Sequence, residues 1–403
     1  MKGQRLAAID TAWLHMEEPG NLMNICGVFV FEGPLDPGSL RELLRERLLC
    51  FAPFRCRVVE LPMRRVCWQE DPEFDLDRHL VVLERTEDLF GLVSELLSQP
   101  LDRSRPLWMM HCLPYRQGWA LIARLHHAIG DGVALMHVLG HLADRVPDTY
   151  RAPHLERPQG PLPWTRSAIG LVRDVLLKPE PMTSLKGPLG RAKRVAVSAP
   201  IDLESLKKTR QRLGCTLNDL LLGALSGSLR AYLLQRGATA PAIRVVMPVD
   251  LRKPHDKKLG NFFGLAFVSL PLGESEPLRR IELLRAQLAR LKRSYQPVIL
   301  CGILWLAGLL PRLLESLLVR LFGSRATAVV TNVPGPKVPM ELRGQPLREL
   351  MFWVPQSGRL GVGISLISYA DTFRIGVATD AGLIPHPEEI VQGFEAELAQ
   401  LAG

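Results

Sequence analysis

The hydrophobic positions of this 403-residue chain form short continuous runs in some places and helically spaced stripes in others. Short runs that are rich in β-forming residues and end at glycine or proline predict strands, and apolar residues three or four positions apart predict amphipathic helices. The predicted strands are 6–33, 64–69, 121–127, 243–249, 259–270 and 328–336, then LGVGISLISY and TFRIGVATD. The predicted helices are 39–49 with Ser39 as its cap, 89–97, a helix after Gly132 that ends near Val146, 202–213, 216–234, 278–295 and 385–401. Strands and helices are thus interspersed along the whole chain.

The length of the chain exceeds that of one typical domain and predicts two. Residues 147–194 differ in character from what precedes and follows them, because eight prolines interrupt any long element and, from residue 166 onward, basic residues outnumber acidic ones. We therefore expect an N-terminal domain at 1–146, a basic, proline-rich connection at 147–194 and a C-terminal domain at 195–403. Within the connection, WTRSAIGLVRDVLL at residues 164–177 could form a short amphipathic helix. Such a helix suits a membrane interface or a place across the domain junction, and the sequence does not favour one over the other.

The most apolar stretch is VILCGILWLAGLL at residues 298–310. Pro311 ends it well short of the ~20 residues that a transmembrane helix requires. The stretch predicts a helix that is buried or lines a tunnel, with docking on a membrane as the alternative.

Composition narrows the class of protein. A hydrophobic content of 47% and a charged content of 23% are those of a globular protein. The net charge of +9 fits polyphosphorylated cofactors or anionic membrane surfaces as partners. Nucleic acid is not expected, because no basic run is interleaved with aromatic residues.

The seven cysteines form no CxxC pair and no regular framework, which indicates free thiols in a reducing compartment. The N-terminus lacks the continuous apolar core of a signal peptide. The expected location is the cytoplasm.

The stretch LIARLHHAIGDGVALMHVL at residues 121–139 carries the strongest candidate chemistry. Side chains alternate between the two faces of a strand, so His126 and His127 point in opposite directions and only one can enter a cleft. Gly130 and Gly132 permit backbone angles that other residues avoid, and Asp131 between them suits a tight turn. An isolated HxxxD pattern is more often a matter of packing, but the doublet followed by Asp-Gly is far more restrictive.

Two other catalytic classes have weaker support. His137 and His141 have the i, i+4 spacing that lets two imidazoles share a metal ion, but the Glu of HExxH and a third ligand are missing. Two packing or surface histidines are the preferred interpretation, and no metal is expected. The absence of a GxSxG motif disfavours a serine hydrolase.

His126, His127, Asp131 and Gly132 resemble the HHxxxDG signature of acyltransferases that share the chloramphenicol-acetyltransferase fold. The flanking sequence resembles the wax ester synthase/diacylglycerol acyltransferase (WS/DGAT) family. Asp10 matches an Asp in the family's opening, Pro106-Leu107-Trp108 its PLW segment, and TNVPGP at 331–336 its SNVPGP segment, with Thr331 in place of Ser. The resemblance runs from Asp10 to the C-terminus. Members with established lipid activity are generally somewhat longer, which leaves the acceptor range open.

The resemblance implies an α/β fold of two chloramphenicol-acetyltransferase-like domains, each a mixed β-sheet with flanking helices, and an active-site tunnel at their interface. It assigns His127 as the general base, with His126, Asp131 and Gly132 completing the catalytic motif and Arg252 pairing with Asp131. Asn218 and Asp219 match the family's ND motif, although capping of a helix is the simpler interpretation of both. The positions expected to support the active site or bind substrate are Asn218, Asp219, Arg252, Asn261, Thr331, Asn332, Pro334 and Gly335.

The implied activity is transfer of a long-chain acyl group from acyl-CoA to diacylglycerol or a long-chain alcohol, with no covalent acyl-enzyme. Acyl-CoA is then a co-substrate, no cofactor is permanently bound, and a membrane or lipid-body surface is the expected peripheral partner. The alternatives are O-acylation of another lipid or a polyketide alcohol, and a lipid-surface binding protein with little catalysis. Oligomeric state, acceptor and chain length do not follow from the sequence.

Overall fold

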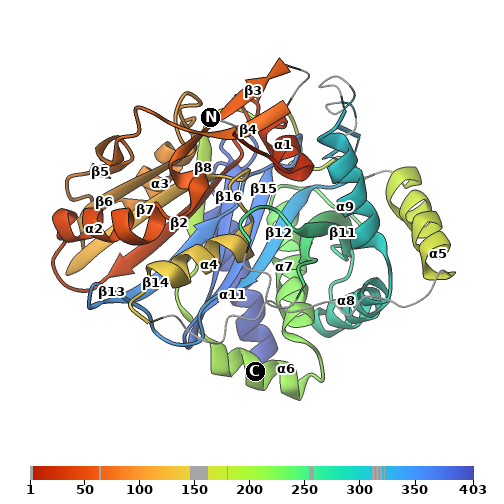
Figure 1. The fold of residues 1–403 in the computed structure, drawn as a ribbon. Helices are drawn as coiled ribbons and strands as arrows, with labels where there is room; N and C mark the ends of the chain where they lie inside the picture. The colour runs from red at the N-terminus through yellow and green to blue at the C-terminus, as the bar shows by residue number, and fades with distance from the viewer. Residues whose placement is uncertain are drawn as a thin grey trace.

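The computed structural model describes residues 3–62, 65–145, 162–178, 180–253, 258–310 and 323–403, together with Leu314, Leu317, Arg320 and Leu321. Two large mixed sheets lie side by side, and helices cover them (Figure 1). The expected two-domain α/β fold with mixed sheets is confirmed.

The first sheet carries the histidine doublet at the end of one of its central strands. Its strand order is β13 (Glu341–Leu342), β14 (Gln345–Trp353), β2 (Asn24–Phe31), β7 (Gly118–His126), β6 (Trp108–Tyr115) and β5 (Leu80–Val82). All neighbours are antiparallel except β5 and β6. Asn24 at the start of β2 pairs with His126 at the end of β7, so the doublet lies where this central strand ends.

The second sheet has the order β11 (Phe263–Leu270), β10 (Ile243–Asp250), β12 (Ala328–Pro334), β15 (Val362–Tyr369), β16 (Thr372–Asp380) and β8 (Lys193–Val197). Short β9 (Ile201–Asp202) also pairs with β16. β12 runs parallel to both β10 and β15, and the other pairs are antiparallel. A separate small sheet joins β1 (Gln4–Arg5), β4 (Arg65–Glu70) and β3 (Cys56–Leu61).

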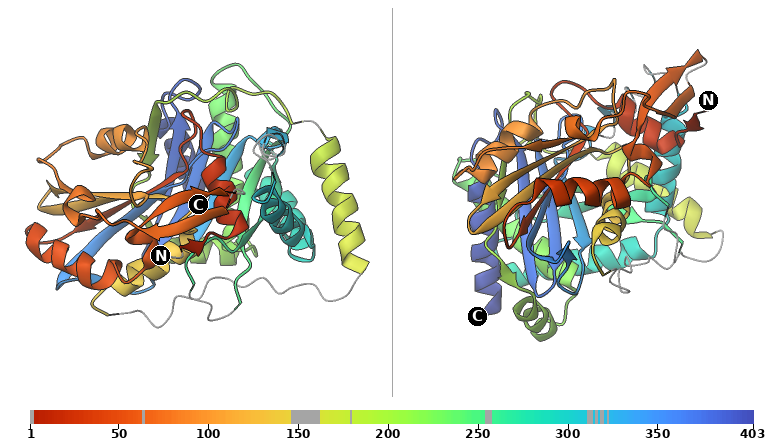
Figure 2. Two further views of the ribbon diagram at one scale, coloured as in Figure 1. Left: turned by 45° about the horizontal axis from the view of Figure 1, so that its top comes forward. Right: turned by 60° about the vertical axis from the view of Figure 1, so that its left-hand side comes forward.

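Two strands of the C-terminal part, β14 and the two-residue β13 beside it, belong to the sheet of the N-terminal half. β14 belongs to the C-terminal part of the sequence, yet it extends the first sheet by pairing with β2, for example Leu350 with Phe29. Figure 2 shows this blue strand among the red and orange strands of the N-terminal half. We keep 1–146 and 195–403 as the proposed domains, with β13 and β14 as the strands that the second contributes to the sheet of the first.

Most of the helices are amphipathic segments that bury one face, whereas α9 (Gln296–Ala307) is apolar on all sides. The other described helices are α1 (Ala8–His15), α2 (Pro37–Leu43), α3 (Leu89–Leu97), α4 (Gly132–Leu142), α5 (Leu162–Leu171), α6 (Leu203–Arg212), α7 (Leu217–Leu234), α8 (Pro277–Lys292) and α11 (Glu388–Ala402). α7 and α11 pack together beneath the second sheet, where Leu225 and Phe394 are fully buried. A second core fills the N-terminal half around Phe54 and Trp108.

Most predicted elements are confirmed to within a few residues, and three details are wrong. The segment 6–33 is not one strand, because residues 8–15 form helix α1 and only Asn24–Phe31 are extended. Asp36, rather than Ser39, caps α2 by accepting hydrogen bonds from the N–H groups of Gly38 and Ser39. Helix α4 ends at Leu142, short of the expected end near Val146, which lies outside the described residues.

The amphipathic helix expected in the connection is present as α5 and a following π-helical turn, Val172–Leu177, although the side chain of Trp164 lies outside the described part. The 298–310 stretch forms most of α9. Within the described ranges, no helix combines the length and the apolar character needed to cross a bilayer.

Candidate active site

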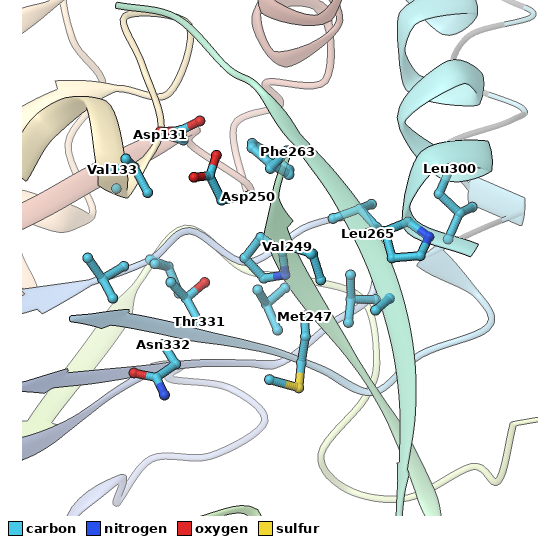
Figure 3. Close-up of a pocket in the computed structure, with 18 of the residues that line it drawn as sticks. Asp131, Val133, Met247, Val249, Asp250, Phe263, Leu265, Leu300, Thr331 and Asn332 are labelled. Atoms are coloured by element: carbon cyan, nitrogen blue, oxygen red, sulfur yellow. The ribbon is translucent and has the colours of Figure 1, made fainter. Parts of the chain in front are cut away.

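A cavity of about 1070 Å³ lies between the two halves and is bordered by the end of β7 on one side and by α9 on the other. This volume is at the upper end of those typical for small-molecule sites. Figure 3 shows how its walls change in character, from Asp131 and Asp250 at one end, past Met247 and Val249, to Leu265 and Leu300 at the other.

The alternation of side chains along β7 sends the two histidines into different surroundings. His126 is only 1% exposed and does not line the cavity. Its Nδ1 accepts a hydrogen bond from the N–H of Ala128 at 3.0 Å, which leaves the ring proton on Nε2. That nitrogen lies 3.7 Å from Oε2 of Glu17, a carboxylate that also pairs with Arg103. Burial, with the nearby Arg103 charge, lowers the pKa of His126 to about 3, so this ring is a neutral structural group.

His127 lines the cavity and is held on two sides. The indole of Trp13 stacks on its ring, with centroids 4.2 Å apart and planes 11° from parallel. Its Nδ1 lies 3.0 Å from Oδ1 of Asn261. Both contacts restrict the ring to one orientation.

The proton on His127 can be assigned from the orientation of the Asn261 amide. Nδ2 of Asn261 donates to Oδ1 of Asp10 and to the carbonyl oxygen of His127, both at 2.8 Å. Oδ1 is therefore the atom that faces the imidazole and accepts a hydrogen bond from Nδ1–H. The lone pair of His127 is consequently on Nε2. The two neighbouring histidines thus carry their protons on opposite nitrogens.

Burial dominates the electrostatics of this end of the cavity. It lowers the pKa of His127, an effect that the Asp131 carboxylate and the hydrogen bond with Asn261 partly offset. It also raises the pKa of Asp10 to about 6, although the two hydrogen bonds from Asn261 act in the opposite direction. His127 is therefore in its neutral, proton-accepting form near neutral pH.

Three hydrogen bonds hold the side chain of Asp131. Its Oδ1 caps α4 by accepting from the N–H of Ala134 at 3.0 Å, and its Oδ2 accepts from Arg252 Nη1 at 2.8 Å and from the N–H of Phe262 at 3.0 Å. Nη2 of Arg252 donates to the carbonyl oxygen of Gly260 at 2.8 Å. The expected pairing of Asp131 with Arg252 is thus present, and it fastens the loop after β7 to the loop before β11.

Two glycines beside this site, Gly260 and Gly132, cannot take a side chain without strain or a close contact. Gly260 has a φ of +116°, a conformation that side chains with a Cβ rarely adopt. At Gly132, an added Cβ would lie 2.8 Å from Cγ2 of Val333.

The remaining expected residues divide into two groups. The amide Nδ2 of Asn332 donates to Oδ1 of Asn218 at 2.6 Å, and both residues line the cavity with Thr331 and Pro334. Asp219 instead forms a capping box with Thr216 at the start of α7, as the simpler interpretation had it. Gly335 lies outside the cavity lining, where its N–H donates to the carbonyl oxygen of Ser368.

His141 contacts the ring of Phe51 and lies 3.7 Å from Sγ of Cys50. Among the residues that the structure describes, no group of three or more potential ligands could hold a metal ion.

Three residues of this site were missed in the sequence: Trp13, Glu17 and Arg103. Trp13 follows Asp10 by three positions, a spacing that places both on one face of a helix. That signal was lost because the segment was interpreted as a strand. The contacts of Glu17 and Arg103 with each other and with His126 have no local sequence signal.

The fold and the site together define a class, the two-domain acyltransferases with an HHxxxDG motif at a cavity between the halves. Within it, the chain belongs to the wax ester synthase/diacylglycerol acyltransferase family, since residues 6–179 match the family's catalytic domain and residues 259–402 match its C-terminal domain. It is an O-acyltransferase of the acyl-CoA type.

Individual proteins are similar to this chain over almost its whole length, in sequence or in fold. A Mycobacterium tuberculosis (strain H37Rv) protein named probable diacylglycerol O-acyltransferase tgs1 is 27% identical over 98% of this chain and 95% of its own length. The solved wax ester synthase/diacylglycerol acyltransferase from Marinobacter aquaeolei VT8 superposes with a TM-score of 0.75 at 22% identity, covering 99% of this chain and 98% of that one. The first condensation domain of the calcium-dependent antibiotic synthetase has the same fold, with a TM-score of 0.65 at 17% identity over 100% of this chain and 96% of that chain.

Proposed function

We propose that this enzyme transfers a long-chain acyl group from acyl-CoA to a lipid alcohol, diacylglycerol or a long-chain alcohol, with His127 as the general base. The observation that carries the proposal is the unprotonated Nε2 of His127 beside a large cavity with mainly apolar walls. A thioester and an alcohol with long chains fit such walls, because apolar lining stabilises chains over their whole length.

In the proposed reaction, Nε2 of His127 takes the proton of the acceptor hydroxyl as its oxygen attacks the thioester carbonyl. The tetrahedral oxyanion then collapses, the carbon–sulfur bond breaks, and the imidazolium returns its proton to the departing thiolate. An imidazolium easily protonates this thiolate, because the corresponding thiol has a pKa of roughly 8.5. No covalent acyl-enzyme is formed, and no protein nucleophile is needed.

Asp10 and Asn261 are the proposed positioning residues. Asp10 holds the amide of Asn261 so that its oxygen faces Nδ1–H of the imidazole. This arrangement keeps the lone pair on the nitrogen that must act and stabilises the imidazolium formed during the reaction. A carboxylate that acts through an amide supports the base without carrying a full charge beside it.

Asn218 is the proposed donor to a substrate oxygen. Its Oδ1 is occupied by Asn332, so Nδ2 is the amide atom left for an oxygen in the cavity. Asp131 and Arg252 have no proposed part in proton transfer. Their role is to hold the loops on which His127 and Asn261 lie.

Purified protein incubated with labelled palmitoyl-CoA and a panel of alcohols and diacylglycerols tests the proposal. We expect labelled triacylglycerol, wax ester or both. Transfer only to other lipid or polyketide alcohols would favour the second candidate activity. No turnover of palmitoyl-CoA with any acceptor would favour a lipid-surface binding protein.

The insoluble products require contact with a lipid surface, and we propose peripheral attachment at a membrane or lipid body. The basic segment 164–177 is the first candidate for that contact, through Arg166, Arg173 and the adjacent Lys178.

A further inference from the structure

Exposed apolar side chains are concentrated at one corner of the molecule. Of the 17 large hydrophobic side chains exposed in the described part, six lie between residues 305 and 321 and three lie on α5 and the turn that follows it. Trp305 and Leu306 lie at the end of α9, and Leu309, Leu314, Leu317 and Leu321 follow it in the chain; we call these six residues the α9 face. Large apolar side chains that are exposed and close together in the sequence are candidates for an interaction site.

Helix α9 has two apolar faces with different surroundings. Leu300, Ile303 and Leu304 line the cavity, whereas Trp305, near the end of the helix, and Leu309, just beyond it, are 55% and 47% exposed and do not line the cavity. No charged residue occurs from residue 296 to residue 310. The helix is therefore a thin apolar wall between the cavity and the outside of the protein.

The surroundings of the α9 face are basic. Lys292 and Arg293 are exposed at the end of α8 and also line the cavity, and Arg320 is exposed within the face itself. Helix α5, which bears the exposed Arg166, packs beside α9, where Oγ of Ser167 accepts from the N–H of Tyr295. Figure 2 shows α5 at the outer edge of this corner. Apolar side chains surrounded by basic ones are typical of helices that lie in the interface of an anionic bilayer.

We infer that the α9 face inserts into a lipid surface with anionic headgroups, and that the lipid acceptor passes from that surface into the cavity along α9. The inference rests on the proposed function for the identity of the acceptor. It goes beyond the attachment through segment 164–177, because it assigns the inserted side chains to a different segment and makes α9 the entrance for one substrate. Segment 164–177 then supplies charge beside the inserted face.

Flotation with vesicles of phosphatidylcholine and phosphatidylglycerol tests the surface independently of activity. The variant Trp305→Glu/Leu309→Glu places two charges on the face, and Val82→Glu/Val338→Glu is its matched control, because Val82 and Val338 are each 48% exposed and lie outside the face. We expect wild type and control to float at low salt. The fraction of the face variant that floats should be at least tenfold smaller than that of wild type. If all three proteins float equally, or wild type does not float, the inference is wrong. Leu314→Glu/Leu317→Glu is a second face variant, should circular dichroism show the first to be unfolded.

Activity with two kinds of acceptor separates this inference from the proposed function. With diacylglycerol presented in vesicles, the face variant should transfer the acyl group at least tenfold more slowly than wild type. With a water-soluble short-chain alcohol, its rate should equal that of wild type. Equal loss with both acceptors overturns the entrance role. If wild type transfers the acyl group to no alcohol but still floats, the proposed function is wrong, whereas the insertion of the α9 face into a lipid surface is supported. Sedimentation that shows a dimer broken by the face variant, without flotation of wild type, would make the face a contact between two copies.

Discussion

The two ends of the cavity are built on different principles. At the His127 end, the polar groups that hold the base have directional partners: Asn261 is hydrogen-bonded to both Asp10 and the imidazole, and Asp131 is paired with Arg252. At the α9 end, Leu265, Leu300 and Ile303 offer apolar contacts, which do not depend on direction. The first end fixes atoms for one reaction, and the second accepts chains of different length and shape.

The difference bears on tolerance to change. Removing one partner of a buried polar pair leaves the other unsatisfied, which costs more than the bond itself contributed. Apolar contacts are lost in proportion to area, so one truncation changes little when neighbours remain. Substitutions should therefore have graded effects, largest at His127 and smallest at α9.

The largest effect is expected at the histidine doublet. His127→Ala should lower kcat by roughly 10²- to 10⁴-fold, the range for loss of a general base, while the protein stays folded. His126→Ala, which removes a ring outside the cavity, should retain part of the activity. Steady-state rates with the best acceptor and circular dichroism of both variants provide the measurement. Equal rates for wild type and His127→Ala would disprove the assignment of the base.

The next effect concerns stability. Arg252→Ala leaves the buried Asp131 carboxylate without its charge partner, and such a loss costs about 3–5 kcal/mol. We expect a clear fall in the free energy of unfolding by urea, together with a fall in rate. Arg279→Ala is the matched control, because its pair with Glu282 is exposed and should contribute less than about 1 kcal/mol. A melting curve for Arg252→Ala like that of wild type would show the pair to be unimportant.

A smaller effect is expected at Asn261, the hydrogen-bond partner of His127. Asn261→Ala removes the acceptor for Nδ1–H of His127, a hydrogen bond to a group that becomes charged and is worth about 1.5–3 kcal/mol, or roughly 10- to 100-fold in rate. Burial already lowers the pKa of His127, so the acid limb of the wild-type pH–rate profile should lie below pH 6.5. Because Asn261 opposes that shift, the acid limb of the variant should move to still lower pH. A fall in rate with an unmoved limb would indicate a merely structural role.

Asp10→Asn is the companion variant, since an amide oxygen can still accept from Asn261. It should retain most of the activity and change the pH dependence of stability instead. The unfolded chain releases the Asp10 proton near pH 3.8, whereas the folded protein holds it until about pH 6. This group therefore makes the free energy of unfolding fall as pH rises between those values, and the fall should be weaker in the variant. An unchanged pH dependence would contradict the raised pKa.

The smallest effect is expected at the apolar end. Leu304→Ala shortens one half-buried side chain of the cavity wall. Each methylene that loses its contact is worth about 0.8 kcal/mol, or about fourfold, so the rate with palmitoyl-CoA should change only a few-fold. Competition between acyl-CoA donors of different length measures this. A loss as large as that of Asn261→Ala would remove the contrast between the two ends.

The sequence predicts the parts of this site that lie within one local motif. The doublet and Asp131 are separated by only a few positions, and the geometry of a strand end and a turn relates them directly. The strands β10, β11, β12, β15 and β16 are also predictable, because each is an apolar run between turn residues. Arg252 was found through resemblance rather than through any local pattern.

The parts that were missed depend on contacts between distant segments. Asp10 and Asn261 are 251 positions apart, so no periodicity connects the carboxylate to the amide it orients. Helix α1 was grouped with the β-forming run of β2, although Glu17-Glu18-Pro19-Gly20 separates the two elements. Strand β14 gave no signal of the sheet to which it belongs. Asp219 shows the opposite case, where a residue in a family motif has a local role in capping.

The crossing of β14 has a consequence for the order in which the protein can be made. A nascent chain that has left the ribosome as far as residue 344 holds β2 with one edge bare, because its neighbour on that side is residues 345–353. An uncovered strand edge in the middle of a future sheet is a site for wrong pairing with other chains. The sheet of the N-terminal half therefore cannot be completed until residues 345–353 have been synthesised. The two stretches that match the family's two domains are separate along the gene, but neither is a unit that can be completed alone.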